Sequence, residues 1–472
     1  MSQPSVLIRS GTKATLAVGA ITALVLAIRA ALILGPAHDY DEGVYWQSLL
    51  AMSDGHALYR DIFYSQPPLF LIVVYGFFVA FGKTLVAARI AMVVSSAVNI
   101  AAMSWIGFRL AGRTGMVAAL VLLGLNYFDL RQAISLQAEA PALALSTLSV
   151  ALSLEWYERR GSPRLVWLAC GAGAAAGAAV LCKLLVVACL LPFCTFAVAR
   201  RDWRGLVAFT AGAAVIFALI LARFADRLPQ LVTQTIAFHV SVGKAFAAEE
   251  VTRWPLIASA FFTPLAALAL AGVIGAVYLR DVRGAALVLW LCGVVAALSR
   301  VTPLWGEHHL SALQPPLIAL GVYGWNFGRK HEMRPIALAV TLTLFITIIF
   351  QAFVSFYSLT SLLKVDSHMA IVRDLRRNVP QTGWVVTDGQ AIAATAGRQT
   401  PPFLVDTSLV RIRSGYLTSA EMIQQTNNPQ VRAVLIASSR FHLPQMRLFR
   451  DWLAHHFRRY ARYSRTEELW VR

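Results

Sequence analysis

The feature of this sequence that most constrains its fold is a succession of long apolar blocks separated by short polar loops. About 17–25 consecutive apolar residues suffice to cross the hydrocarbon core of a bilayer. The composition agrees, since 58% of the residues are hydrophobic and 14% are charged, whereas a soluble domain is about half apolar and a quarter charged. We therefore expect a polytopic α-helical membrane protein. The blocks expected to cross the membrane are 14–34, 88–108, 114–130, 139–156, 165–182, 184–199, 205–224, 255–278, 285–299, 310–326 and 335–357.

The charge balance is strongly basic, with 42 Lys and Arg against 24 Asp and Glu and a formal net charge of +18. In a soluble protein this balance would suggest a nucleic-acid partner. Here much of the positive charge falls in short loops between apolar blocks, which is typical of cytoplasmic loops. We expect no nucleic acid and a cytoplasmic N-terminus. The clusters are Arg9/Lys13, Arg109/Arg113, Arg159/Arg160/Arg164, Arg200/Arg201/Arg204, Arg280/Arg283 and Arg329/Lys330/Arg334.

The number of crossings between two cytoplasmic clusters must be even. Three apolar blocks lie between Lys13 and Arg109, and the middle one, 67–82, is the shortest and opens with two prolines. We therefore interpret 67–82 as a re-entrant or interfacial helix that does not cross. This leaves about eleven spanning helices, with further interfacial helices in a first outer loop over residues 35–87.

The chain changes character near residue 366. Residues 1–365 form the expected transmembrane domain, and 366–472 alternate short β-like runs with helical stretches, a pattern typical of a small α/β domain. Its arginine-rich end is either a solvated face or a contact for anionic lipid headgroups or an anionic acceptor. We expect this domain on the extracytoplasmic side. The expected strands are 384–387 and 431–437, and the expected helices 367–377, 418–426 and 445–456.

The first outer loop places carboxylates at the membrane boundary, at Asp39, Asp41 and Glu42. These acids are either incidental to a hydrated loop or functional. The functional alternative has physical support, because a carboxylate at a membrane edge is costly to bury and needs a reason to be there. A sugar acceptor hydroxyl is a poor nucleophile, and a carboxylate within hydrogen-bond reach can take its proton. A donor with a phosphate leaving group needs cations where the negative charge develops.

The loop resembles the first loop of the GT-C superfamily of glycosyltransferases, and more narrowly that of the protein O-mannosyltransferase and lipid A aminoarabinose transferase-like group (glycosyltransferase family 39). The resemblance extends to about Gln314. It implies that Asp41 is the base. We expect Glu42 to act beside it, and Tyr45 and Gln66 to orient the acceptor. Relatives that act on lipid A have a lysine where this chain has Gln66, which weakens that specificity. The residues that carry the resemblance are Asp41-Glu42, Tyr45, Gly55, Pro67-Pro68, Phe81-Gly82 and Arg89.

Lys183 is the most informative residue of the membrane region, because a lysine inside an apolar block is a candidate functional residue. The alternative is a lysine that snorkels to the interface. The family has a lysine at this place, which implies that Lys183 binds the polyprenyl phosphate. Glu139 lies at the outer start of a helix, where it either orients acceptor and cations or complements the helix dipole.

A second basic cluster follows the block 285–299. Arg300 can pair with phosphate oxygens through two hydrogen bonds, and His308 and His309 can add donors. The Glu-His-His run also leaves a metal site open, and Trp305 can be a plain interfacial anchor. Arg131 is expected on the same outer side and completes the set of candidate phosphate ligands.

Together these features predict an inverting glycosyltransferase of the EC 2.4 class in a bacterial inner membrane. A polyprenyl-phosphate sugar is the expected donor, with membrane lipids around it, and the acceptor is the hydroxyl of an envelope glycan, lipid or protein. The mechanism requires no cofactor and leaves a divalent metal open. The alternative is a transporter or lipid flippase, which would predict two pseudo-symmetric halves that the sequence does not display.

Overall fold

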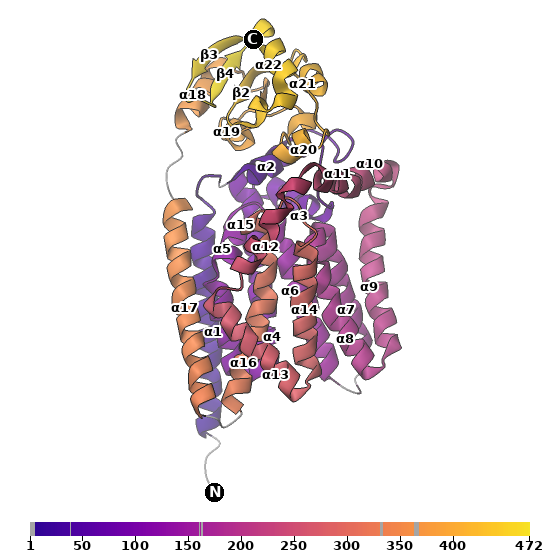
Figure 1. Cartoon of the computed structure of the whole chain (residues 1–472), viewed down its shortest axis with the longest axis vertical. Coiled ribbons are helices and arrows are strands. Elements are labelled where there is room, and N and C mark those ends of the chain that lie inside the picture. Colours follow the sequence, from indigo (N-terminus) through magenta and orange to yellow (C-terminus); the bar gives the residue numbers. More distant parts are fainter. Residues whose placement is uncertain (1–4, 38, 160, 162–163, 331–333, 363–367) are drawn as a thin grey trace.

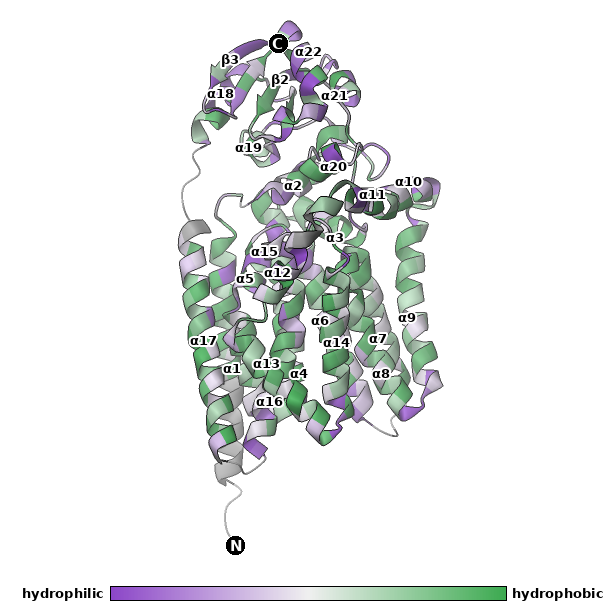
Figure 2. Cartoon of the chain, viewed as in Figure 1, coloured by the Kyte–Doolittle hydropathy of each residue, from purple (hydrophilic) through white to green (hydrophobic). Residues whose placement is uncertain are grey.

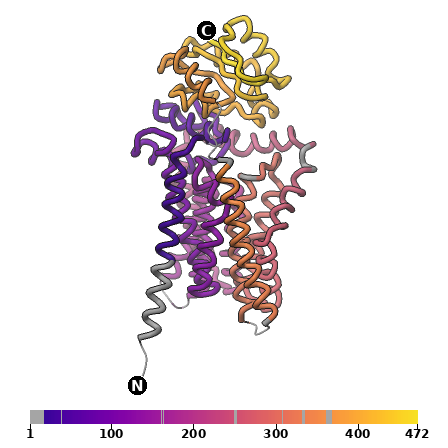
Figure 3. The backbone as a smooth tube through the Cα atoms, turned by 90° about the vertical axis from the view of Figure 1, so that its left-hand side faces the viewer, coloured from indigo at the N-terminus to yellow at the C-terminus, as the bar shows by residue number. Residues whose placement is uncertain are grey.

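The computed structural model describes the whole chain except residues 1–4, 38, 160, 162–163, 331–333 and 363–367. A bundle of helices carries a small α/β domain at one end (Figures 1 and 3). The long helices run roughly along one axis, and short helices lie across the end that faces the α/β domain. The helices of the bundle are α1 (Ser5–Leu32), α4 (Leu85–Gly124), α6 (Glu139–Glu158), α7 (Leu165–Cys182), α8 (Leu190–Arg200), α9 (Trp203–Ala222), α13 (Pro264–Leu279), α14 (Val282–Leu298), α16 (Gln314–Lys330) and α17 (Arg334–Leu362).

The 40 residues assigned to α4 form two antiparallel segments rather than one rod. The chain reverses at Ala111 and Gly112, where Gly112 has a φ of 67° that favours glycine. The two segments touch so closely that a Cβ on Gly107 would lie 2.4 Å from the carbonyl oxygen of Gly115. This hairpin corresponds to the two expected blocks 88–108 and 114–130, although the second segment ends at Gly124.

The basic loops gather at the end of the bundle opposite the α/β domain. Arg109 forms an ion pair with Glu158, and Arg283 lies 3.5 Å from the same carboxylate. Arg329 donates to Thr114 at 3.3 Å. Figure 2 shows hydrophilic residues at this end and a predominantly hydrophobic middle. The structure therefore places Arg109, Arg283 and Arg329 at one end of the bundle, as the parity argument predicts, while the side of the membrane on which they lie stays a prediction.

Within the described residues, four helices contain a stretch that is long and apolar enough to cross a membrane: α4, α7, α9 and residues 335–360 of α17. A fifth span results if α12 (Arg253–Ser259) and α13, which meet at 83°, are counted as one. Several other apolar helices, such as Val282–Leu298, are shorter. A polytopic helical architecture is thus confirmed, and the count of eleven crossings stays a prediction.

The first outer loop contains two helices, α2 (Tyr40–Ser53) and α3 (Leu69–Ala80). The 12 residues of α3 extend about 18 Å, which is too short for a hydrocarbon core of about 30 Å. This agrees with the expectation that block 67–82 does not cross. Short helices from the later outer segments lie at the same end of the bundle: α5 (Tyr127–Ile134), α10 (Leu228–Val232), α11 (Phe238–Ala245) and α15 (Gly306–His309).

The C-terminal domain is built on a four-stranded sheet with the order β1-β2-β4-β3. Strands β1 and β2 are parallel, whereas β4 is antiparallel to both β2 and β3. The first two strands form where the sequence predicts them, because their Val-rich runs are buried on both faces of the sheet. The elements are α18 (Met369–Asn378), β1 (Trp384–Thr387), α19 (Gln390–Thr395), α20 (Leu409–Arg413), α21 (Ser419–Thr426), β2 (Val431–Ile436), α22 (Arg447–His456), β3 (Arg458–Arg462) and β4 (Glu468–Val471).

Helix α2 lies between the bundle and the C-terminal domain. Gln47 of α2 donates to the carbonyl oxygens of Gln390 at 3.3 Å and Arg398 at 3.0 Å. Thr407 donates its backbone N–H to the Tyr40 hydroxyl at 2.7 Å. At Gly43, a Cβ would lie only 2.5 Å from the backbone nitrogen of Ala391. The domain is therefore docked directly on the helix that carries the acidic motif.

Candidate functional site

Helix α2 positions the acidic motif, and Asp39 is its N-cap. The Asp39 carboxylate accepts a hydrogen bond from the backbone N–H of Glu42 at 2.9 Å, which satisfies a free donor of the first turn. Each residue of an α-helix is rotated by about 100° from its neighbour. Asp41 and Glu42 therefore project in different directions, and their surroundings differ.

Glu42 points into the bundle and is fully buried together with Arg89. The guanidinium of Arg89 donates to both carboxylate oxygens of Glu42 at 2.7 Å, and the N–H of Leu136 donates at 2.7 Å. Arg89 also donates to backbone carbonyls of the turn after α1, including Gly35 at 2.7 Å. Glu42 does not line the cavity described below, so its placement favours holding α2 on the bundle over acting in catalysis.

Asp41 points the other way, into a cavity of about 150 Å³ under the C-terminal domain. Its side chain is half-buried, and among the described residues its carboxylate has no hydrogen bond or ion pair. Burial raises the pKa of Asp41 above its ordinary value of 3.8, an effect that His308 and Lys183 oppose. Asp41 is thus a carboxylate open to a ligand, with a pKa moved toward the range useful for proton transfer.

Lys183 lies in the same cavity as Asp41. It ends α7, with an extended backbone (φ −156°, ψ 126°) that stops the helix. Its ammonium group forms an ion pair with the carboxylate of Glu139, at the start of α6. Glu139 is 3% exposed and does not line the cavity. The pair therefore presents a lysine, held in place from behind by a carboxylate, to the space beside Asp41.

Asp39 connects several of the candidate residues, although the sequence reasoning did not select it. Gln137 donates to both of its carboxylate oxygens, at 2.9 and 2.8 Å. Arg131 lies 3.5 Å and His308 3.8 Å from the same group. Burial and the neighbouring charge of Asp41 raise the pKa of Asp39 to about 6. Arg131 is thereby engaged with Asp39 and does not line the cavity.

Some of the remaining candidates line the cavity, and one does not. His308, His309, Tyr45 and Gln66 all line the cavity with Asp41 and Lys183. Burial, together with the charge of Lys183, lowers the pKa of His309 to about 3, so its imidazole is neutral near pH 7. Arg300 is exposed and does not line the cavity. The structure thus does not bring Arg300 to Asp41.

The C-terminal domain supplies residues that the sequence reasoning missed. Asp406, Ser408 and Val410 line the cavity from above, and His239 of α11 lines it from the side. Asp406 is separated from Asp41 by more than 360 residues in the chain, and no local pattern marks it. Asp39, by contrast, had a local signal, because an aspartate directly before a helix is a typical N-cap.

No group of three or more His, Cys, Asp or Glu side chains with the arrangement of a metal site occurs among the described residues. Among the described residues that line the cavity with Asp41, Lys183 is the one lysine or arginine.

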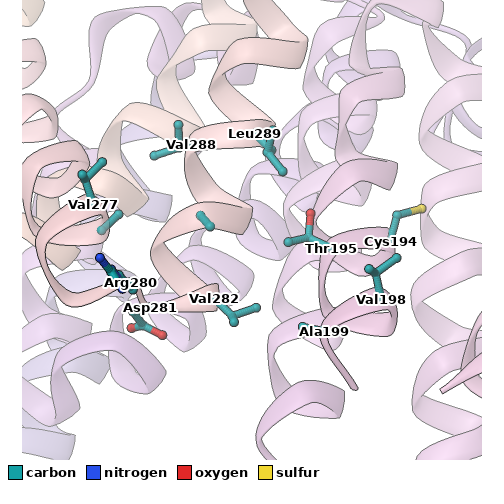
Figure 4. A pocket seen from close by; sticks show the side chains of 12 residues that line it. Cys194, Thr195, Val198, Ala199, Val277, Arg280, Asp281, Val282, Val288 and Leu289 are labelled. Atoms are coloured by element: carbon teal, nitrogen blue, oxygen red, sulfur yellow. The ribbon is translucent and has the colours of Figure 1, made fainter. Parts of the chain in front are cut away.

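A larger hollow lies at the opposite end of the bundle. It has a volume of about 860 Å³ and lies between α8 and the facing helices α13 and α14 (Figure 4). Its lining is mostly apolar, and its acidic residue, Asp281, is already bonded to Arg283 at 3.0 Å and Tyr323 at 3.0 Å. This hollow is a groove between apolar helices. Its carboxylate is already bonded, and no lysine is among the described residues that line it.

Comparison with known proteins gives structural matches only. No protein-family profile matches the chain, and no curated protein matches it by sequence. The crystal structure of ArnT from Cupriavidus metallidurans bound to undecaprenyl phosphate superposes with a TM-score of 0.62, at 14% identity, over 97% of each chain. The apo state of the same protein gives 0.62 at 12% identity over 98% of each chain.

A second match is more distant. The oligosaccharyltransferase AglB from Archaeoglobus fulgidus, in complex with an inhibitory peptide and a dolichol-phosphate, superposes with a TM-score of 0.51 at 13% identity, over 91% of this chain and 71% of that one. ArnT, a lipid A aminoarabinose transferase, and AglB are both glycosyltransferases of the GT-C fold. The structure therefore confirms the fold that the sequence resemblance implies: this chain has a GT-C fold.

Proposed function

We propose that this chain is an inverting glycosyltransferase that moves a sugar from a polyprenyl-phosphate donor to a hydroxyl acceptor at the outer face of the membrane. The observation that carries the proposal is that Asp41, with its open carboxylate, and Lys183 line one cavity under the C-terminal domain. Support comes from the structural neighbours, since one is bound to undecaprenyl phosphate and another to a dolichol-phosphate.

In the proposed reaction, Asp41 accepts the proton of the acceptor hydroxyl as its oxygen attacks the anomeric carbon. The bond between that carbon and the phosphate oxygen breaks, and the polyprenyl phosphate leaves with the electron pair. Lys183 meets the negative charge of the departing phosphate, because an ammonium group is a compact point charge. A single displacement inverts the anomeric centre, and the proton ends on Asp41.

Glu139 has a positioning role in this proposal. It holds Lys183 toward the cavity, and a bound phosphate would share the ammonium group with it. His308 lies 3.8 Å from Asp39 and lines the cavity with Asp41. In this proposal it adds a hydrogen bond to the donor. Because Lys183 supplies fixed positive charge, the proposal requires no metal. If EDTA abolished sugar transfer and a divalent cation restored it, the reaction would require a metal and this part of the proposal would be wrong.

The direct test is transfer of a labelled sugar from candidate polyprenyl-phosphate donors. We expect Asp41→Asn to reduce transfer by about 10²- to 10⁴-fold, the range typical of a general base. Asp54→Asn, which changes an exposed aspartate at the other end of α2, should leave transfer unchanged. Equal rates for wild type and Asp41→Asn would remove Asp41 as the base and end the proposal.

A further inference from the structure

A second cavity adjoins the first at Asp41. It has a volume of about 520 Å³, and Asp41, Trp305 and His308 line both cavities. Lys183 lines only the first cavity, whereas Arg440 of the C-terminal domain lines only the second. In a displacement with inversion, the acceptor and the leaving group lie on opposite sides of the reacting carbon. If Lys183 holds the phosphate, the second cavity is where the acceptor hydroxyl reaches Asp41.

The C-terminal domain contributes a ligand-binding edge to this cavity. Strands β1 and β2 are parallel neighbours, and the loops at the carboxyl ends of parallel strands are the usual place for ligands in α/β domains. These two loops contain Asp388 and the segment 437–440. Asp388 is 1% exposed, and its carboxylate accepts from the N–H of Ala437 and the hydroxyl of Ser438, both at 2.6 Å. This buried network fixes the loop that carries Arg440.

Arg440 is held so that part of its guanidinium remains available. It lies over the ring of Tyr40, with its central carbon 3.8 Å from the ring centroid. One terminal nitrogen donates to the carbonyl oxygen of Asp388 at 3.0 Å and to Ser438 at 3.3 Å. Within the described part of the chain, the other terminal nitrogen and Nε have no hydrogen-bond partner. Such a planar pair of donors matches a carboxylate or a phosphate.

The other walls match a hydroxylated ring. Ser439 is exposed and Trp305 is 49% exposed, which gives the cavity an exposed hydroxyl and a large apolar surface. An extended peptide would bind more naturally by adding to a sheet edge. Edge strand β1 is already covered, since the N–H of Val385 donates to the carbonyl oxygen of Gln399 at 2.8 Å. The cavity thus offers side chains rather than a free strand edge.

We propose that this second cavity is the acceptor subsite and that its ligand is an anionic saccharide, whose carboxylate or phosphate is bound by Arg440 while a ring hydroxyl faces Asp41. This inference rests on the proposed function and assigns the substrate class of the same site. It also gives the C-terminal domain a specific task, which is to select the acceptor by charge.

The test is a binding measurement that needs neither donor nor transfer. The full chain, in phosphatidylcholine nanodiscs, is titrated with methyl β-glucuronide, methyl β-glucoside 6-phosphate and the neutral methyl β-glucoside, with binding followed by saturation-transfer NMR. We expect at least one anionic probe to bind about ten- to a hundredfold more tightly than the neutral one, the range of a charged hydrogen-bonded pair. The two anionic probes distinguish a carboxylate from a phosphate as the group that is bound.

Arg440→Gln should abolish this preference and leave binding of the neutral probe unchanged, and Arg440→Lys should restore only part of it. Arg432→Gln, which changes an exposed arginine of β2 outside the cavity, is the control. Ser439→Asp adds a negative charge at an exposed position of the cavity and should lower the ratio of anionic to neutral binding, whereas Ser439→Asn, which is of similar size but neutral, should preserve that ratio. This second pair keeps the test valid if Arg440→Gln does not fold.

Equal affinity for charged and neutral probes in the wild type would overturn the inference. So would tighter, Arg440-dependent binding of an acidic peptide than of either anionic sugar. Failure of the proposed function has a separate signature, which is undiminished sugar transfer by Asp41→Asn. Because the probes bind without a donor, the binding result does not depend on sugar transfer. Failure of the inference and failure of the proposed function can therefore be distinguished.

Discussion

At the scale of single residues, the environment of each side chain separates neighbours that look alike in the sequence. Asp41 and Glu42 are consecutive acids, yet Glu42 is fully buried against Arg89 whereas Asp41 faces a cavity. A buried carboxylate with a bidentate arginine partner contributes to the position of its helix. A half-buried carboxylate without a partner among the described residues is available to a ligand.

Replacing Lys183 tests its role at the phosphate. We expect Lys183→Gln to lower kcat/KM for the donor by about 10- to 100-fold, because a hydrogen bond to a charged group contributes about 1.5–3 kcal/mol. The single variant also leaves the buried carboxylate of Glu139 without its partner, which destabilises the fold. The double variant with Glu139→Gln should recover the melting temperature but not the use of donor. Recovery of both would assign the pair a purely structural role.

The pH dependence of transfer tests Asp41 as a base. Asp41 acts as a base only when ionised, and burial raises its pKa above 3.8, so activity is present above the raised pKa and is lost as the pH falls through it. The carboxylate of Asp406 also raises this pKa. Asp406→Asn should therefore move the acid limb of the profile to lower pH, measured as kcat/KM between about pH 4 and 8.

Asp451→Asn is the control for this experiment, because Asp451 is an exposed acid of the same domain and its removal should leave the profile in place. An unchanged limb in Asp406→Asn, or a shift to higher pH, would contradict the assignment of that limb to Asp41.

At the scale of elements, α2 is the piece on which the site is assembled. One side of it is tied to the bundle through Glu42 and Arg89, and another accepts the C-terminal domain through Gln47 and Gly43. The helix has only 14 residues, and short helices owe their stability mainly to tertiary packing. A change on either side of α2 should therefore displace Asp41.

Gly43→Leu tests the docking of the C-terminal domain on α2. The added side chain would meet the backbone of α19, because even a Cβ would lie 2.5 Å from the nitrogen of Ala391. We expect a cost of about 1–3 kcal/mol, faster hydrogen exchange in α19 and a loss of transfer. Gly76→Leu is the matched control, since no atom lies within 4 Å of a Cβ at Gly76. Unchanged exchange in Gly43→Leu would show that the contact is not required.

At the scale of the whole molecule, the two ends of the bundle differ in chemistry. One end gathers the basic loops, and the other carries the first outer loop and the α/β domain (Figures 1 and 2). The edge strand β3, with its exposed arginines, lies on the far side of that domain from the bundle (Figure 1). This arrangement therefore favours a solvated face for these arginines over a contact with lipid headgroups.

Cysteine labelling tests which end faces the cytoplasm. Arg113 lies in an exposed turn at the basic end and Arg465 is exposed in the C-terminal domain. In a variant that lacks the native cysteines, a membrane-impermeant maleimide should label Arg465→Cys in intact cells and label Arg113→Cys only after permeabilisation. The reason is the preference of basic loops for the cytoplasm. Labelling of Arg113→Cys in intact cells would reverse the proposed orientation.

The sequence by itself determined the helical membrane architecture, a short helix within block 67–82, the α/β character of the tail and the GT-C fold. Each of these depends on local information, such as the length of an apolar block, the placement of arginines or the order of short motifs. Asp41, Tyr45, Gln66, Lys183, His308 and His309 could also be selected in this way, and the structure brings them to one cavity.

Only the tertiary structure decided which charged groups meet. Arg300 lies in the same outer segment of the sequence as His308 and His309. The two histidines line the cavity, whereas Arg300 is exposed outside it. Glu42 and Asp41 are separated by a helical rotation of about 100°. Which of the two faces the bundle and which faces the cavity depends on how α2 packs, and the sequence does not record this. Asp406 and Arg440 reach Asp41 because the C-terminal domain docks on α2. Contacts between such distant parts of a chain depend on how whole elements pack, and no local pattern records them.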